Sequence, residues 1–104
     1  MNKIVLSGNL TKSIEIRYTA NGLAVANFTI AVKREIKEDE TDFINCVAYN
    51  KTAELVSKYL DKGSKVLIEG RIQTGSYENK EGKKVYTTDV VVDKVEFLNS
   101  KKGE

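Results

Sequence analysis

Apolar and polar residues alternate with a period of two along most of this chain, and this pattern limits what the chain can fold into. In residues 23–34, one face collects the apolar side chains of Ala24, Ala26, Phe28, Ile30 and Val32. Residues 43–50 repeat the pattern, with Ile44, Cys46 and Ala48 on one face and Phe43, Asn45, Val47 and Tyr49 on the other. Successive side chains of a strand point to opposite sides, so both segments are predicted to be β-strands with one buried face.

Three further segments complete the predicted set of strands. The first strand is expected to bend at the Gly8-Asn9 pair and to continue to Tyr18. A fourth strand follows over residues 66–72, where Gly70 allows a bend, and a fifth over residues 85–98. In the fifth, one phase holds Tyr86, Thr88, Val90 and Val92, and the other holds Val95 and Phe97. This change of phase predicts a β-bulge.

Residues 51–62 change to a helical period, with apolar side chains at Ala53, Val56, Tyr59 and Leu60. We expect Asn50 to be the N-cap of this helix and Gly63 to end it. Five strands with one helix between the third and the fourth is the order of the all-β OB-fold, a five-stranded Greek-key barrel. Spacing alone leaves other small barrels open. We predict that residues 1–98 form one such domain and residues 99–104 a short polar tail.

The amino-acid composition disfavours catalysis and metal binding. The chain has no His, so it lacks the usual general base near neutral pH and the commonest nitrogen ligand for metals. Its single cysteine, Cys46, cannot form an internal disulfide and lies in an apolar phase, where we expect it to pack as a small hydrophobe. No pair of carboxylates stands at a spacing typical of an active site. We therefore predict a protein without enzymatic activity, cofactor or metal.

The sequence does not predict a membrane protein. The apolar run after Met1 is too short for a secretory signal, and no stretch approaches the ~20 residues of a membrane-spanning helix. The expected location is the cytoplasm.

Two aromatic residues point away from the predicted core. If the Ile44 side of its strand fills the barrel, Phe43 and Tyr49 lie on the outward side. Outward aromatics either cover a subunit contact or the base of a loop, or form a surface on which unpaired bases stack. Tyr77 lies where the fourth strand enters its hairpin, within reach of the same surface. The loop that follows carries Lys80, Lys83 and Lys84, which are either a flap over a bound strand or soluble turn residues.

Basic residues are interleaved with these rings. The net charge is only +2, from 17 Lys and Arg against 15 Asp and Glu, so binding to a polyanion must come from local patches. Lys33 and Arg34 end the second strand, and Lys51 and Arg71 are placed to flank the same groove. Cations beside aromatic rings suit the phosphates of an unpaired nucleic-acid strand. The acidic residues 38–42 are expected to form a solvated hairpin tip.

Three long segments match one known family in the same order. They are NGLAVANFTIA over residues 21–31, preceded by Arg17 and Tyr18, then YLDKGSKVLIEG over residues 59–70 and YTTDVVV over residues 86–92. These segments strongly resemble the bacterial-type single-stranded DNA-binding proteins. The resemblance runs from Asn2 to about Phe97.

The resemblance implies an OB-fold that assembles as a homotetramer, through its first strands and a sheet-on-sheet contact, with DNA wrapped around it. In this family aromatic residues stack on bases, and matching by segment puts those positions at Ile36, Phe43, Tyr49 and Tyr77. Ile36 departs from the pattern and offers apolar contact alone. Members usually also carry a long tail with an acidic tip that recruits replication and repair proteins. Residues 99–104 do not match that tip, so no such partner is predicted.

The predicted function is therefore sequence-tolerant binding and protection of single-stranded DNA in replication, recombination and repair, at the nucleoid in the cytoplasm. The predicted DNA-binding residues are Lys33, Arg34, Ile36, Phe43, Tyr49, Lys51, Arg71 and Tyr77. The alternative is a primosomal or accessory OB-fold protein that acts mainly through protein contacts. A small enzyme is the rival from another class and is disfavoured by the composition.

Overall fold

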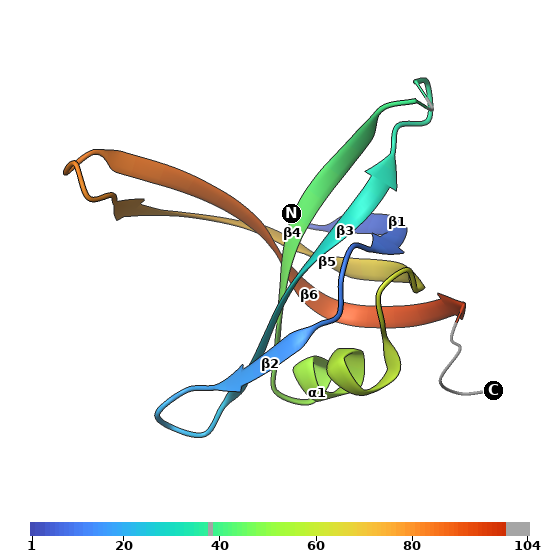
Figure 1. Ribbon diagram of the computed structural model, residues 1–104, viewed down its shortest axis with the longest axis horizontal. Helices are drawn as coiled ribbons and strands as arrows, with labels where there is room; N and C mark the ends of the chain where they lie inside the picture. Colours follow the sequence, from blue (N-terminus) through green and yellow to red (C-terminus); the bar gives the residue numbers. More distant parts are fainter. Residues whose placement is uncertain (38, 100–104) are drawn as a thin grey trace.

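The computed structural model of the protein describes residues 1–37 and 39–99, with the backbone alone at Asn99. In this part of the chain the elements follow in the order β1 (Ile4–Leu10), β2 (Glu15–Tyr18), β3 (Ala24–Lys33), β4 (Thr41–Tyr49), α1 (Asn50–Tyr59), β5 (Lys65–Glu78) and β6 (Lys84–Asn99) (Figure 1). Glu38 and residues 100–104, which include most of the predicted polar tail, lie outside the described residues. No helix in the described part is long and apolar enough to span a membrane.

The strands close into a ring. Neighbouring strands pair in the order β1, β5, β6, β4 and β3, and β3 pairs back onto β1 at Asn9 and Leu10. β2 lies outside this ring, antiparallel to β3. The β4–β6 pairing, at Cys46 and Val47, is parallel, and the other described pairings are antiparallel. A five-stranded ring with one helix between β4 and β5 confirms the predicted fold class, with β1 and β2 in place of one bent first strand.

At the predicted bend, the Gly8-Asn9 pair, β1 passes from one neighbouring strand to another without a break in the strand. It pairs with β5 from Ile4 to Asn9 and with β3 at Asn9 and Leu10. A Cβ atom at Gly8 would lie 2.5 Å from the carbonyl oxygen of Ala31. Glycine is therefore needed here because the backbones of β1 and β3 approach closely.

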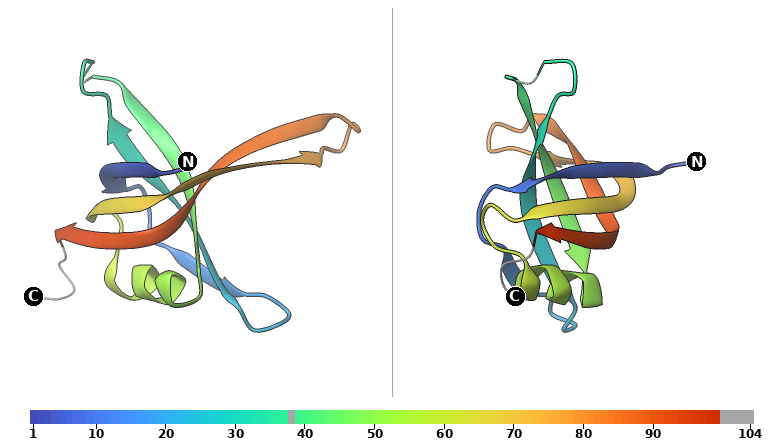
Figure 2. Two further views of the ribbon diagram at one scale, coloured as in Figure 1. Left: turned by 180° about the vertical axis from the view of Figure 1, so that it is seen from behind. Right: turned by 90° about the vertical axis from the view of Figure 1, so that its right-hand side faces the viewer.

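The inward faces of the strands supply the core, as the alternation predicted. The core residues are Leu10, Ala24, Ala26, Phe28, Ile30, Cys46, Ala48, Ala53, Val56, Leu60, Val66, Ile68, Val90 and Val92. Figure 2 shows α1 at one end of the ring, and its Ala53 and Val56 side chains are buried there. The ring of Tyr59 lies 5.7 Å from that of Phe97, between centroids, so this tyrosine packs as predicted. The fold thus buries one face of each central strand and leaves the other available.

Helix α1 starts one residue earlier and ends three residues earlier than predicted. Tyr49 is its N-cap and makes no side-chain cap, so the prediction that Asn50 caps the helix is wrong. Asn50 instead adopts a φ of 56°, a left-handed conformation that asparagine tolerates better than most residues. Gly63 lies in the turn beyond the helix, where its N–H donates to the carbonyl oxygen of Leu10 at 2.8 Å.

Two hairpins, β3–β4 and β5–β6, project from the ring and diverge (Figure 1). Where β5–β6 leaves the ring, Glu69 pairs with Lys94 but Gly70 pairs with Val92, so Asp93 is an extra residue and the predicted bulge is confirmed. Tyr86 shares the phase of the buried Val90 but is itself exposed. It lies on the part of the hairpin that extends past the core.

Candidate nucleic-acid interface

The β3–β4 hairpin presents three of the predicted residues on one side. Phe43 pairs with Ala31 and Tyr49 pairs with Val25, and Lys33 is two residues beyond Ala31 on β3. Paired residues, and residues two apart on one strand, point to the same side of a sheet. The three side chains therefore share the outward face, opposite the core residues of both strands.

The sheet register carries this face across to the β5–β6 hairpin. Val47 of β4 pairs with Val91 of β6, and Val91 pairs with Arg71 of β5. Tyr77 is six residues further along β5 and has the same parity as Arg71, so it points to the same side. Five predicted residues, from two hairpins, thus lie on one continuous face. We call this the aromatic face, and it consists of Lys33, Phe43, Tyr49, Arg71 and Tyr77.

The three rings of the aromatic face are open to solvent. The exposed fraction is 67% for Phe43, 44% for Tyr49 and 56% for Tyr77. Between them, Val47 is half-buried, and Val91 is buried although it lies outside the core cluster. Exposed rings above an apolar floor form a surface on which planar bases can stack.

Exposed amides lie between the rings. Asn27, Asn45 and Gln73 all point to the aromatic face by their register. Thr29 donates from its hydroxyl to the Oδ1 atom of Asn45 at 3.1 Å, which leaves the amide N–H groups of Asn45 free for a ligand. Such groups can hydrogen-bond to phosphates or to the edges of bases.

Arg34 is compensated by two carboxylates, those of Glu40 in the loop that joins β3 and β4 and of Asp42 at the start of β4. Its Nη1 atom lies 2.6 Å from Glu40 Oε2, and its Nη2 atom lies 3.0 Å from Asp42 Oδ1. Hydrogen bonds from the Arg34 guanidinium lower the pKa of Asp42 below its ordinary value. The cluster carries one positive and two negative charges near neutral pH. Arg34 must therefore exchange these partners before it can neutralise a phosphate.

The other predicted cations differ in whether a carboxylate pairs with them. Arg71 lies 3.3 Å from a carboxylate oxygen of Asp93, the extra residue of the bulge. Lys33 and Lys51 are exposed and form no ion pair within the described residues. Lys33 lies on the aromatic face, whereas Lys51 lies at the start of α1, two residues beyond Tyr49. Lys33 is thus the predicted cation best placed to meet a phosphate.

Ile36 lies apart from the sheet, in the loop that joins β3 and β4. Its side chain is 96% exposed and has no role in the core. The register of the strands does not bring it onto the aromatic face. Its side chain offers apolar contact without a ring.

Two residues outside the predicted set also carry suitable groups. Arg17 of β2 pairs with Val25, which pairs with Tyr49, so this exposed arginine belongs to the same row. Its segment was among those that carried the family resemblance, but only the β2–β3 register shows that it lies beside Tyr49. The other is Tyr86, on the opposite side of the β5–β6 hairpin. In the sequence, only the nearby Lys84 indicates that this tyrosine could be a binding residue.

Cys46 packs in the core as predicted. Burial raises the pKa of its thiol to about 12, with a smaller contribution from the charge of Asp89. The thiolate is therefore scarce near neutral pH, which disfavours a nucleophilic role. Among the residues that the structure describes, no group of three or more His, Cys, Asp and Glu could hold a metal ion.

Comparison with known proteins places the chain in a family. The pattern of the Single-strand binding protein family matches residues 1–98. This chain belongs to the single-strand binding protein family. The Single-stranded DNA-binding protein of Clostridium perfringens is 51% identical to it over 104 residues, and that of Halalkalibacterium halodurans is 53% identical over 102 residues. Single-stranded DNA-binding protein A of Bacillus subtilis is 49% identical over 107 residues.

These family members are longer than the chain. The three alignments cover 99%, 94% and 99% of this chain but 69%, 61% and 62% of the respective relatives. The chain therefore spans roughly two thirds of the length of each, and the shared part is the single-strand binding region that matches the family.

Proposed function

We propose that this protein binds single-stranded DNA with little sequence preference and protects it during replication, recombination and repair. The aromatic face is the observation that carries the proposal, because three exposed rings, a free lysine and exposed amides share one side of a curved sheet. Membership of the single-strand binding protein family supports the same function. The protein would act at the nucleoid in the cytoplasm, without catalysing a reaction.

In this proposal the protein acts by holding the DNA strand on its surface. Bases stack on Phe43, Tyr49 and Tyr77, each for about 1–3 kcal/mol, without readout of their edges. Phosphates lie against Lys33, Arg71 and the remaining predicted cations, Arg34 and Lys51, while Ile36 provides apolar contact. A strand held in this way cannot pair with its complement and is shielded from nucleases. A duplex is a poor ligand because its bases are already stacked.

A titration with three labelled ligands tests the function. We expect oligo-dT to bind far more tightly than a duplex of the same length, at both low and moderate salt. An RNA of matched sequence tests whether affinity depends on the sugar of the strand. Equal affinity for oligo-dT and duplex would contradict the proposal.

The salt dependence of affinity should separate the cations from the rings. Each cation that meets a phosphate contributes about 0.7 to the slope of log affinity against log salt for a single strand. We expect Lys33→Ala to lower the slope by about this amount. Arg34→Ala should weaken binding less, because Glu40 and Asp42 already compensate the guanidinium. Tyr49→Ala should lower affinity at every salt concentration without changing the slope.

The reverse pattern would show that the two roles are misassigned. If Tyr49→Ala flattened the slope and Lys33→Ala did not, the phosphate and stacking contacts would lie elsewhere. A weak slope throughout would favour the alternative function, an accessory OB-fold protein whose main ligand is another protein. The carboxylates that pair with Arg34 and Arg71 are the observation that keeps this alternative open.

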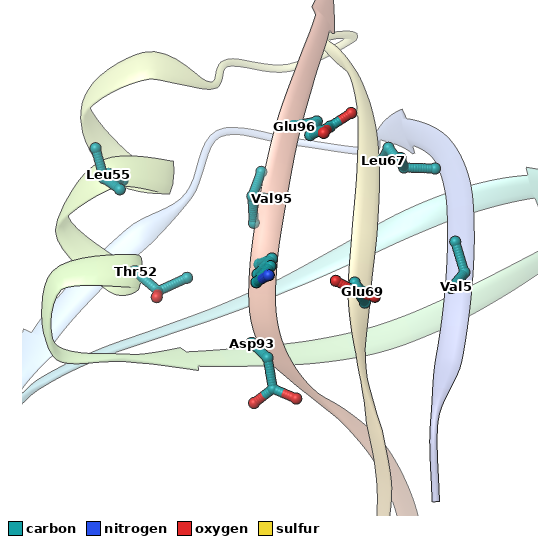
Figure 3. A pocket seen from close by; sticks show the side chains of 9 residues that line it. Val5, Thr52, Leu55, Leu67, Glu69, Asp93, Val95 and Glu96 are labelled. Atoms are coloured by element: carbon teal, nitrogen blue, oxygen red, sulfur yellow. The ribbon is translucent and has the colours of Figure 1, made fainter.

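We also propose that the protein assembles with itself, as a homotetramer. A groove of about 540 Å³ runs over β1, β5, β6 and α1 (Figure 3). Its lining combines the apolar side chains of Val5, Leu55, Leu67 and Val95 with the polar ones of Thr52, Glu69, Asp93, Lys94 and Glu96. Val5 and Leu55 are exposed. Beside the groove, residues 4–7 of β1 pair only with β5 among the described strands, so their other edge is open. An open strand edge next to a groove with exposed apolar side chains favours contact with a second copy of the chain. The number four rests on the family.

Val5→Asp should break this assembly, because a charge would be buried where the subunits meet. We expect sedimentation of the wild type at micromolar concentration to give a tetramer and the variant to give a smaller species. Leu23→Asp is the matched control, since Leu23 is similarly exposed but lies outside the groove. A monomeric wild type would contradict the proposed assembly.

A further inference from the structure

The β5–β6 hairpin carries a second exposed aromatic ring, on the side away from the aromatic face. Tyr86 pairs with Ser76, whereas Tyr77 pairs with Val85, so the two tyrosines point to opposite sides of the hairpin. We call the side that holds Tyr86 the reverse face. It is lined by Ile72, Thr74, Ser76, Glu78, Lys84, Tyr86 and Thr88.

Tyr86 does not serve the core. Its side chain is 76% exposed, more than any ring of the aromatic face. The Nζ atom of Lys84 lies 5.6 Å from the centroid of the ring, within the range of a cation–π contact. Most of the ring stays accessible beside this cation. An exposed ring with an adjacent lysine is the combination that stacks a base and neutralises the neighbouring phosphate.

The rest of the reverse face also suits an unpaired strand. From Tyr86 towards the barrel it carries two threonines, Ser76 and the partly exposed Ile72, and no charge. With a rise of about 3.3 Å per residue, the six steps from Lys84 to Val90 span about 20 Å. Among the described residues of this face, Glu78 is the one carboxylate, opposite Lys84. The face therefore repels a polyanion at one position only.

We propose that the reverse face is a second contact for single-stranded DNA, in which a base stacks on Tyr86 and a phosphate lies near Lys84. A strand bound to the aromatic face continues around the tip of the hairpin, where Lys80 and Lys83 are exposed, and returns along the reverse face. One hairpin then holds two segments of the same strand. This inference rests on the proposed function.

The second contact is expected to depend on the length of the DNA. A short strand fills the aromatic face and cannot reach around the tip. In a longer strand the second segment is tethered to the first, so its effective concentration near the reverse face is high. Loss of Tyr86 should therefore affect long ligands and leave short ones unchanged.

The test compares Tyr86→Ala with Tyr77→Ala on oligo-dT of about 8 and about 30 nucleotides. The shorter ligand lies within the range of site sizes of one OB-fold, about 4–16 nucleotides, and the longer one exceeds it. For Tyr86→Ala we expect affinity for the long ligand to fall by about fivefold or more, and affinity for the short ligand to change by less than about twofold. Tyr77→Ala should weaken both. Tyr86→Phe, which keeps the ring, should behave as the wild type.

The outcomes separate this inference from the proposed function. If the wild type binds neither ligand, the proposed function itself fails. If Tyr77→Ala weakens binding while Tyr86→Ala matches the wild type on both ligands, DNA binding stands and the reverse face is not a contact. If Tyr86→Ala lost the same affinity for both ligands, the inference would also be overturned, because the contribution of Tyr86 would then not depend on the length of the DNA. The mass of each variant in solution is measured in parallel, and a change of assembly in Tyr86→Ala would assign the reverse face to a protein contact instead.

Discussion

Loss of both Phe43 and Tyr77 should weaken the binding of oligo-dT by about 2–6 kcal/mol, if each stacked base contributes about 1–3 kcal/mol. The two rings lie on different hairpins, so we expect their contributions to add. Both side chains are exposed, and the double alanine variant should therefore unfold at nearly the same denaturant concentration as the wild type. Anisotropy titrations of labelled oligo-dT measure the first quantity, and urea unfolding measures the second.

Leucine at the same two positions is the matched control. It keeps apolar contact with a base but removes the ring, so affinity should fall between those of the wild type and the double alanine variant. Alanine and leucine variants of equal affinity would show that ring stacking is not the source of the energy. An unchanged affinity in the alanine variant would place the DNA on another surface.

A larger effect on stability is expected at Gly70, where a side chain has no space. A Cβ atom there would lie 2.1 Å from the carbonyl oxygen of Val91 and 3.2 Å from the Cα of Val92. Both atoms belong to the backbone of β6 and cannot rotate away. Gly70→Ala should therefore lower the free energy of unfolding by about 3 kcal/mol or more, at the upper end of the cost of overpacking. Thermal and urea unfolding measure this loss.

Gly75 provides the control on the same strand. A Cβ atom there meets the Oγ1 atom of Thr87 at 3.1 Å, and that hydroxyl can turn to another rotamer. Gly75→Ala should change the free energy of unfolding by well under about 1 kcal/mol, since alanine also restricts the unfolded chain. If Gly70→Ala were as mild as Gly75→Ala, the close approach of β5 and β6 would not be needed for the fold.

The buried faces of the central strands follow from the amino-acid sequence alone. Alternation is a local property, because each side chain of a strand points opposite to its neighbours whatever the strand pairs with. The sequence therefore predicted the apolar phase of β3 and β4, and with it the outward direction of Phe43 and Tyr49. The change of phase in residues 85–98 likewise predicted the bulge, although not that Asp93 is the extra residue.

The helix boundaries and the roles of glycines were harder to predict from the sequence. Asn50 is a residue type that favours the N-cap position, but it is the first residue of α1 and adopts a left-handed φ directly after β4. Gly8 was expected at a bend, and the structure adds a second reason for glycine there, the close approach of the Ala31 carbonyl oxygen. That approach joins segments far apart in the chain, which a local pattern does not contain.

The grouping of residues into one surface depends on how the strands pair. The β4–β6 and β5–β6 registers put Arg71 and Tyr77 on the same face as Phe43, and the β4–β6 pairing joins Cys46 to Val90, 44 positions (90 − 46) further along the chain. The β3–β4 connection brought Glu40 and Asp42 onto Arg34 and changed the expected strength of that cation. The length of the β5–β6 hairpin beyond the core exposed Tyr86, although its phase is the inward one. Alternation states the side to which a residue points, and the extent of the neighbouring strands decides whether anything covers that side.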